Sequence, residues 1–204
     1  MNVNLLKNSE AYATNSGCAE YNEIGDFYGG LARVGKHLSD YMMKYGFIDK
    51  QGNLIIPLKY DVAYDFLGEV APVGIRMNED VKYGFINKLG DEVIPITYDY
   101  ASYLSKTLCV TNNHRGWNVF TTEGNLISTY DEIYRTSNQD LIKVKINGKY
   151  GLISSKDGYK LTEIKYDEVR DITNNSVSAR VNNKWHNLRC KNIIKKNVHY
   201  LWTD

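Results

Sequence analysis

The chain has 204 residues, 43% of them hydrophobic, which is enough to bury the core of one ordinary domain or of a short repeat array. Its formal net charge of +1 excludes the strongly basic field that a general nucleic-acid binder carries. No stretch reaches the roughly 18 apolar residues that a membrane-spanning helix needs.

Three cysteines, Cys18, Cys109 and Cys190, lie far apart in the sequence. Their number and spacing fit neither a disulfide framework nor a zinc site. The first residues, 1–8, lack the apolar run of a signal peptide. We therefore expect a protein that works in a reduced, cytoplasmic setting.

The N-terminal part of the chain contains two different segments. Residues 1–20 carry Ser, Asn, Thr and Gly and match no repeating segment, so we expect an N-terminal arm or cap. Residues 21–36 contain YNEI and LARV, which match only the second half of the repeat described next. This segment therefore predicts half of a repeat unit.

The first complete repeat predicts three short antiparallel strands. Residues 45–49 (YGFID) favour a strand, 50–53 (KQGN) a turn, and 54–57 (LIIP) the returning strand. A glycine in so short a connection is typical of a hairpin. A tyrosine–acid pair at 60–61 predicts a turn, in which the aspartate bonds local backbone. The apolar segment 70–73 (VAPV) predicts the third strand.

The same order of elements returns along the rest of the chain. The aromatic residues that open successive copies are 38, 34, 33 and 35 residues apart, and such a period indicates an array of similar supersecondary units. The turn residue of the fifth copy is Asn192, and asparagine is the best substitute for glycine at positive φ. The turn glycines are Gly52, Gly90, Gly124 and Gly158. The predicted units lie near 45–77, 83–113, 117–147 and 150–182, with a C-terminal half unit at 185–200.

Four whole units and two complementary halves allow two architectures. In an open array the halves cap the two ends, whereas in a closed five-bladed propeller they join into one blade. Each unit is small for a four-stranded blade, which favours the open array slightly. We therefore predict an all-β fold, in which a single domain at 21–200 is a tandem array of about five three-stranded antiparallel units.

These motifs resemble the bacterial WG-repeat family, whose repeats begin with tryptophan or tyrosine followed by glycine. The resemblance covers about residues 21–197 and is closest at 45–73 and in the copy at 83–110. Asn118 and His186 depart from the pattern because they replace the glycine. The resemblance implies a repeat scaffold without a common enzymatic activity. It therefore implies binding rather than catalysis, and it transfers no functional residue.

The sequence predicts no catalytic residue, metal ligand or cofactor. The repeated aspartates recur once per unit, which indicates that the unit needs them for its structure. Cys109 lies in an apolar strand and is expected to be a small core residue. The histidines lack the spacing of a metal site. They are His37, His114, His186 and His199.

Arginines outside the consensus positions are the candidate binding residues. Repeat scaffolds keep their core constant and bind through variable positions on one face. We expect a protein partner, in an immunity or inhibitor role of bacterial or phage origin. The alternative is a small anionic ligand, a nucleotide or a glycan, and a carboxylate-dependent hydrolase ranks last. The candidates are Arg76, Arg115, Arg135, Arg170 and Arg180.

Overall fold

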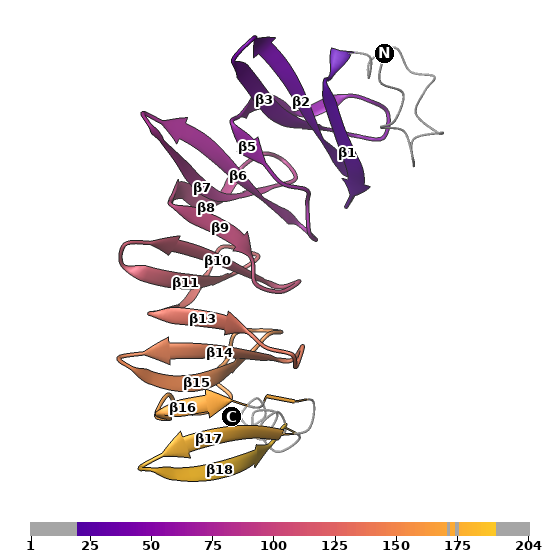
Figure 1. The fold of residues 1–204 in the computed structure, drawn as a ribbon. Helices are drawn as coiled ribbons and strands as arrows, with labels where there is room; N and C mark the ends of the chain where they lie inside the picture. Colours follow the sequence, from indigo (N-terminus) through magenta and orange to yellow (C-terminus); the bar gives the residue numbers. More distant parts are fainter. Residues whose placement is uncertain (1–19, 171, 174–175, 191–204) are drawn as a thin grey trace. The chain divides into compact units, whose positions relative to one another are not determined.

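The computed structural model describes residues 20–170, 172–173 and 176–190 (Figure 1). Eighteen β-strands form nearly all of the regular structure of this part of the chain. The chain divides into two compact units, residues 1–101 and 102–204. No helix within the described residues is long and apolar enough to cross a membrane.

The N-terminal unit contains two four-stranded sheets, in which neighbours in sequence are also neighbours in the sheet. Sheet 1 consists of β1 (Glu23–Tyr28), β2 (Leu31–Ser39), β3 (Met42–Ile48) and β4 (Leu54–Tyr60). Sheet 2 consists of β5 (Val62–Ala63), β6 (Val70–Met77), β7 (Asp80–Asn87) and β8 (Glu92–Tyr98).

The C-terminal unit holds three further sheets of the same sequential order. Sheet 3 consists of β9 (Tyr100–Tyr103), which spans the division between the units, with β10 (Leu108–Asn113), β11 (Gly116–Thr121) and β12 (Leu126–Tyr130). Sheet 4 consists of β13 (Glu132–Arg135), β14 (Leu141–Ile146) and β15 (Lys149–Ser154). Sheet 5 consists of β16 (Glu168–Arg170), β17 (Ser176–Val181) and β18 (Lys184–Arg189).

The predicted fold class is confirmed: the protein is an all-β tandem array of small antiparallel sheets. Within the described residues every sheet runs from one edge strand to another, so none closes into a barrel. Sheets 1, 2 and 3 have four strands rather than the predicted three. In sheet 2 the additional strand is β5, which directly follows the tyrosine–acid pair. The predicted arm at 1–20 lies outside the described residues except for residue 20, as do residues 191–200 of the last half unit.

Each sheet joins the end of one sequence repeat to the beginning of the next. The first half unit supplies β1 and β2, and β2 pairs with β3, so that Ala32 faces Ile48. At the other end β17 pairs with β18, so that Val177 faces Leu188. The described residues of both half units therefore belong to sheets 1 and 5.

Two-residue turns explain this arrangement. The connection from β14 to β15 is Asn147-Gly148, and both residues have positive φ, at 49° and 76°. The connection from β17 to β18 is Asn182-Asn183, with φ of 51° and 61°. Asparagine and glycine at positive φ match the right-handed twist of the paired strands, so the tightest hairpins form across the repeat boundary.

The predicted glycine turns within each repeat are confirmed as well. Gly52, Gly90, Gly124 and Gly158 have φ values of 85°, 86°, 87° and 73°. The aspartate before the first of these turns stabilises it, because Asp49 Oδ1 accepts the amide protons of Gln51 and Asn53, both at 2.9 Å. The predicted fifth turn at Asn192 lies outside the described residues.

The glycine that follows the aromatic residue has a separate steric cause. A Cβ at Gly46 would lie 2.4 Å from the carbonyl oxygen of Ile56, and one at Gly84 would lie 2.5 Å from that of Ile94. Opposite both glycines the strand pairing is irregular, in the segments of β4 and β8 that begin with Pro57 and Pro95. In the third repeat there is no proline.

In the third repeat, which lacks the proline, the glycine is replaced as well. Asn118 takes the glycine position in β11 and pairs regularly with Thr129 of β12. The Thr129 hydroxyl donates to Asn118 Oδ1 at 2.8 Å. The third repeat therefore lacks both consensus residues, whereas the fourth repeat keeps Gly151 without a proline, and a Cβ there would lie 2.8 Å from Cγ1 of Ile164 and 3.1 Å from its Cα.

Buried side chains form a separate core cluster between neighbouring sheets in each unit. In the N-terminal unit the Phe47 and Phe66 rings meet edge to face, with centroids 4.9 Å apart, and Tyr60 is fully buried beside them. In the C-terminal unit Tyr130 and Tyr166, also from tyrosine–acid pairs, occupy two further clusters. Burial of these residues supplies the main stabilisation of the array.

Candidate functional site

One strand position varies in chemistry from sheet to sheet, and it lies directly opposite the aromatic residue that opens each repeat. The aromatic residue is always Tyr or Trp, whereas its partner is glycine in sheets 1 and 2, asparagine in sheet 3, lysine in sheet 4 and arginine in sheet 5. The pairs are Tyr45 with Gly35, Tyr83 with Gly74, Trp117 with Asn112, Tyr150 with Lys145, and Trp185 with Arg180.

In the N-terminal unit the aromatic ring covers its partner. A Cβ added at Gly74 would lie 3.0 Å from Cε1 of Tyr83, so the ring occupies the space that a side chain would need. Gly35 is covered in the same way by Tyr45. This position of sheets 1 and 2 therefore offers no side chain to a partner.

Sheet 5 presents two arginines on an exposed tryptophan. The guanidinium carbon of Arg170 lies 4.0 Å from the centroid of the Trp185 ring, and that of Arg180 lies 5.7 Å from it. Glu168 pairs with Arg180 at 3.2 Å and reaches Arg170 only at 3.9 Å. The tryptophan is 42% exposed. The ring and the glutamate hold the two cations side by side at the surface.

Sheet 4 repeats this arrangement with lysines. Lys145 lies over the Tyr150 ring at 5.3 Å and pairs with Glu132 at 2.6 Å. The hydrogen bond to Glu132 raises the pKa of Lys145, so the ammonium group stays charged at neutral pH. Lys143 lies 4.5 Å from the Tyr134 centroid and 5.3 Å from that of Tyr150.

The cations of the two sheets belong to one surface. The ammonium group of Lys143 in β14 donates to the carbonyl oxygen of Val169 in β16 at 3.5 Å. Val169 is buried and directly precedes Arg170, so the lysine adjoins the arginine pair of the next sheet. We call this surface the basic-aromatic face. Its residues are Lys143, Lys145, Arg170, Arg180, Tyr134, Tyr150 and Trp185.

The aspartates of the tyrosine–acid pairs link consecutive sheets. Asp61 accepts the amide proton of Arg76, fifteen residues further on, at 2.8 Å, and the ammonium of Lys44 at 2.7 Å. The Asp131 carboxylate accepts the amide proton of Asn147 at 2.6 Å. The aspartates thus bond backbone of the next sheet, whereas the sequence predicted a local turn.

The same contacts set the ionisation of these carboxyls. Burial acts to raise the pKa of Asp61, but the hydrogen bonds from Arg76 and Lys44 outweigh it and lower the pKa. The hydrogen bond from Lys149 lowers the pKa of Asp167. Both carboxyls are therefore ionised at neutral pH and engaged in holding the sheets together.

The two described cysteines are poor nucleophiles. Cys109 is buried, as predicted, and burial raises the pKa of its thiol to about 12. Burial also raises the pKa of Cys190, whose Sγ donates to the carbonyl oxygen of Thr173 at 3.4 Å. Both thiols are therefore protonated at neutral pH. Because the thiolate is the reactive form, both are expected to be unreactive.

We expect a maleimide reagent at pH 7 to leave Cys109 and Cys190 unmodified in the folded protein and to modify both in urea. Peptide mass spectrometry of the two samples measures this directly. Rapid modification of Cys109 in the folded protein would contradict its burial.

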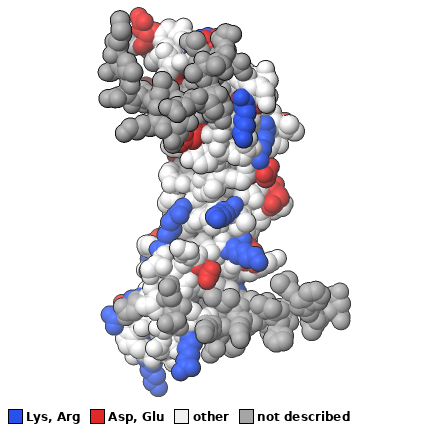
Figure 2. Space-filling model, turned by 90° about the vertical axis from the view of Figure 1, so that its right-hand side faces the viewer, with Lys and Arg blue, Asp and Glu red and all other residues white. Residues whose placement is uncertain are grey.

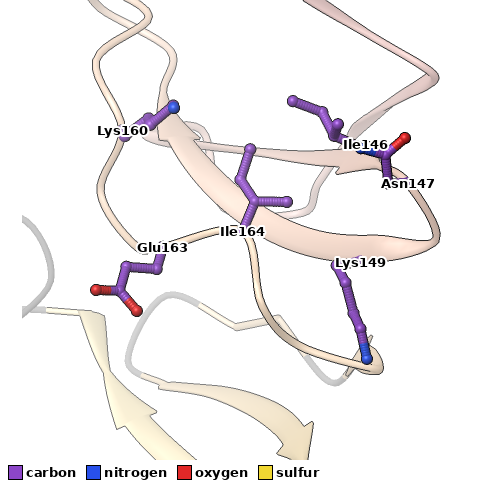
Figure 3. A pocket seen from close by; sticks show the side chains of 6 residues that line it. All are labelled: Ile146, Asn147, Lys149, Lys160, Glu163 and Ile164. Carbon is purple, nitrogen blue, oxygen red and sulfur yellow. The ribbon is translucent and has the colours of Figure 1, made fainter.

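A shallow, open hollow of about 390 Å³ lies beside the turn between β14 and β15. Two of its charged residues pair elsewhere, Lys149 with Asp167 and Glu163 with Lys165. Figure 3 shows Lys149, Lys160 and Glu163 well apart rather than converging on one point. Among the described residues no three His, Cys, Asp or Glu side chains gather as a metal site.

The model of the WG-containing repeat matches five segments that together cover more than half of the chain. They are residues 19–37, 45–75, 83–106, 121–150 and 151–185. The chain belongs to the WG-containing repeat family.

Other comparisons show less. No curated protein matches the chain. A solved structure described as the crystal structure of the eukaryotic initiation factor is similar with a TM-score of 0.46 and 10% sequence identity, over 78% of this chain. This chain spans about half of that one, at 48% of its length.

The WG-repeat fold brings together two of the five candidate arginines. Arg170 and Arg180 share the Trp185 ring. Arg76 lies at the exposed end of β6 in the other unit, and its amide donates to Asp61. Arg115 lies at the tip of the turn between β10 and β11. Arg135, at the end of β13, donates to the carbonyl oxygen of Tyr103.

Sequence reasoning missed the lysines and aromatic rings of the face. A signal was available, because Lys145 precedes Tyr150 by five residues, just as Arg180 precedes Trp185. A two-residue turn places residues five apart directly opposite each other in a hairpin. Recognising the turn at 147–148 would therefore have identified the pair.

Proposed function

We propose that this WG-repeat protein is a non-catalytic scaffold that binds another protein. The observation that supports this is that some positions of the repeat are constant and structural, whereas one position varies between sheets. The aromatic residues, turn glycines and tyrosine–acid pairs build the sheets, whereas the position opposite the aromatic changes from glycine to asparagine, lysine and arginine. Repeat proteins recognise partners through such variable positions on a constant framework.

The structural contacts of the repeated carboxylates and the burial of the described thiols support a non-catalytic role. The repeated aspartates Asp61 and Asp167 are held in ion pairs and backbone hydrogen bonds. The Cys109 and Cys190 thiols are buried and protonated. These groups serve the structure of the repeat, so a carboxylate-dependent hydrolase remains the lowest-ranked function. We place the proposed scaffold in the cytoplasm of a bacterium or phage-infected cell, as an inhibitor or immunity protein.

Affinity capture with the tagged full chain from a lysate of its source cells tests this proposal. We expect one protein to be retained in stoichiometric amount and to be eluted by excess untagged chain. A folded bait that retains no protein, but releases a nucleotide or glycan on denaturation, would support the alternative of a small anionic ligand. The paired guanidinium groups of Arg170 and Arg180 are the observation that favours this alternative.

A further inference from the structure

The charges of this protein are divided unequally between its two units. Residues 1–101 contain nine Lys or Arg and fourteen Asp or Glu, a net charge of −5, whereas residues 102–204 contain sixteen and ten, a net charge of +6. The near-neutral total of +1 hides this division. Figure 2 shows lysine and arginine side chains on one face of the C-terminal unit, with fewer acidic side chains among them.

Longer hairpins also distinguish the N-terminal unit. Tyr45 follows the residue opposite it, Gly35, by ten positions, and Tyr83 follows Gly74 by nine. In sheets 3, 4 and 5 the aromatic residue follows its partner by only five positions. The hairpins β2–β3 and β6–β7 therefore extend beyond the aromatic residue by additional strand pairs.

We call the ends of these two hairpins, residues 38–42 and 77–80, the hairpin tips. All of their residues are exposed, and Tyr41 is 100% exposed. Their charged residues are all acidic, namely Asp40, Glu79 and Asp80. Exposed apolar side chains that gather on a surface are typical of interaction sites. The apolar residues of the tips are Leu38, Tyr41, Met42 and Met77.

A carboxylate links the bases of the two tips. Asp61 accepts hydrogen bonds from the ammonium of Lys44, two residues after the first tip, and from the amide of Arg76, directly before the second. The two tips therefore lie at the same end of the unit. The three corresponding turns of the C-terminal unit contain neither apolar nor acidic residues. They are residues 113–116, 147–148 and 182–183.

We propose that the protein associates head to tail, with the hairpin tips of one copy docked on the basic-aromatic face of a second copy. The tips supply carboxylates and apolar side chains, whereas the face supplies cations and the exposed ring of Trp185, so the two surfaces are complementary. Carboxylates form charge-assisted hydrogen bonds with ammonium and guanidinium groups. Burial of the apolar tip residues adds an attraction that does not depend on charge.

The proposed contact joins two different surfaces of the chain. Each copy in a pair joined by one such contact still has one set of tips or one face available, so further copies can add unless the chain of contacts closes into a ring. The smallest ring is a dimer with two reciprocal contacts. The inference goes beyond the proposed function, because it concerns a second copy rather than another protein.

Sedimentation equilibrium of the full chain tests the proposal. We expect the weight-average mass to rise above that of the monomer as the protein concentration increases at about 50 mM salt. At about 500 mM salt it should fall back toward the monomer, because salt screens the attraction between opposite charges. A monomer at every concentration, or an association that salt does not weaken, would overturn the inference.

Four single variants test whether the tips carry the association. Tyr41→Ser and Glu79→Lys change exposed tip residues, and we expect each to raise the dissociation constant about fivefold or more. Leu89→Ser and Asp26→Lys are the matched controls, because they make similar changes at exposed residues of the same unit, in the turn after β7 and in β1. We expect the controls to stay within about twofold of the wild type. Equal weakening in controls and tip variants would contradict the proposal.

A mixture of two variants tests which surfaces meet. The double variant Tyr41→Ser, Glu79→Lys keeps the face, whereas Lys143→Glu keeps the tips and reverses a charge of the face. We expect each alone to be mainly monomeric and their equimolar mixture to form a one-to-one dimer. A mixture that stays monomeric would show that the tips and the face do not meet. Circular dichroism confirms that each variant is folded, and affinity capture tests the proposed function separately.

Discussion

Replacing Gly84 by alanine should lower the free energy of unfolding of the N-terminal unit by about 3 kcal/mol, because the new methyl group has no space. Its Cβ would lie 2.5 Å from the carbonyl oxygen of Ile94 and 2.6 Å from that of Pro95. Both atoms belong to the backbone of β8, so the strand itself must move. Urea unfolding followed by far-UV circular dichroism measures the loss.

Asn118→Ala is the control for this prediction, because it occupies the equivalent position in a regular strand pairing. We expect it to cost about 1 kcal/mol, because it removes the hydrogen bond from Thr129 and the long one, at 3.4 Å, that Asn118 donates to Thr111. If Gly84→Ala unfolds within about 0.5 kcal/mol of the wild type, the steric explanation of the consensus glycine is wrong.

The second large effect is expected at Asp61. Asp61→Ala removes the acceptor of the Arg76 amide and the partner of Lys44, and we expect it to cost about 2 kcal/mol. The side chain of Asp61 is only 17% exposed, so water does not replace these contacts easily. Asp61→Asn keeps the shape of the side chain but removes the charge, and it separates the electrostatic part from the packing.

This carboxyl also makes stability depend on pH. Its pKa is lowered in the folded state relative to the ordinary value of 3.8, so its ionised form stabilises the protein above that value. The stabilisation is lost as pH falls from about 4 through the lowered pKa. We expect Asp61→Asn to flatten the fall of the unfolding free energy between about pH 5 and pH 2. An unchanged slope in this variant would show that other carboxyls carry the acid sensitivity.

Much of the fold could be predicted from local sequence. The turn glycines were identified correctly because positive φ is a property of one residue and its neighbours, and only glycine or asparagine adopts it cheaply. The repetition of strands and tyrosine–acid pairs predicted an all-β array, because residue types and their spacing are also local properties of the sequence. The burial of Cys109 followed from its place in an apolar strand.

The grouping of strands into sheets could not be predicted from the same signals. Repetition in a sequence does not show where one structural unit ends and the next begins. The predicted units begin at the aromatic–glycine pairs. Hairpins instead form across that division, where Asn147-Gly148 and Asn182-Asn183 supply the tightest turns. The aspartates were misjudged for a related reason, since Asp61 bonds a residue fifteen positions away that only strand pairing brings near.

For the candidate surface too, the sequence predicted individual residues but not which of them lie together. By itself the sequence determined the repeat, the strand class, the turn positions and the set of arginines outside the consensus, because each depends on residue type and spacing along the chain. Only the tertiary structure decided that Arg170 and Arg180 share the Trp185 ring while Arg76, Arg115 and Arg135 lie elsewhere. Strand register and the stacking of sheets 4 and 5 set these neighbours, and both depend on contacts between residues distant in sequence.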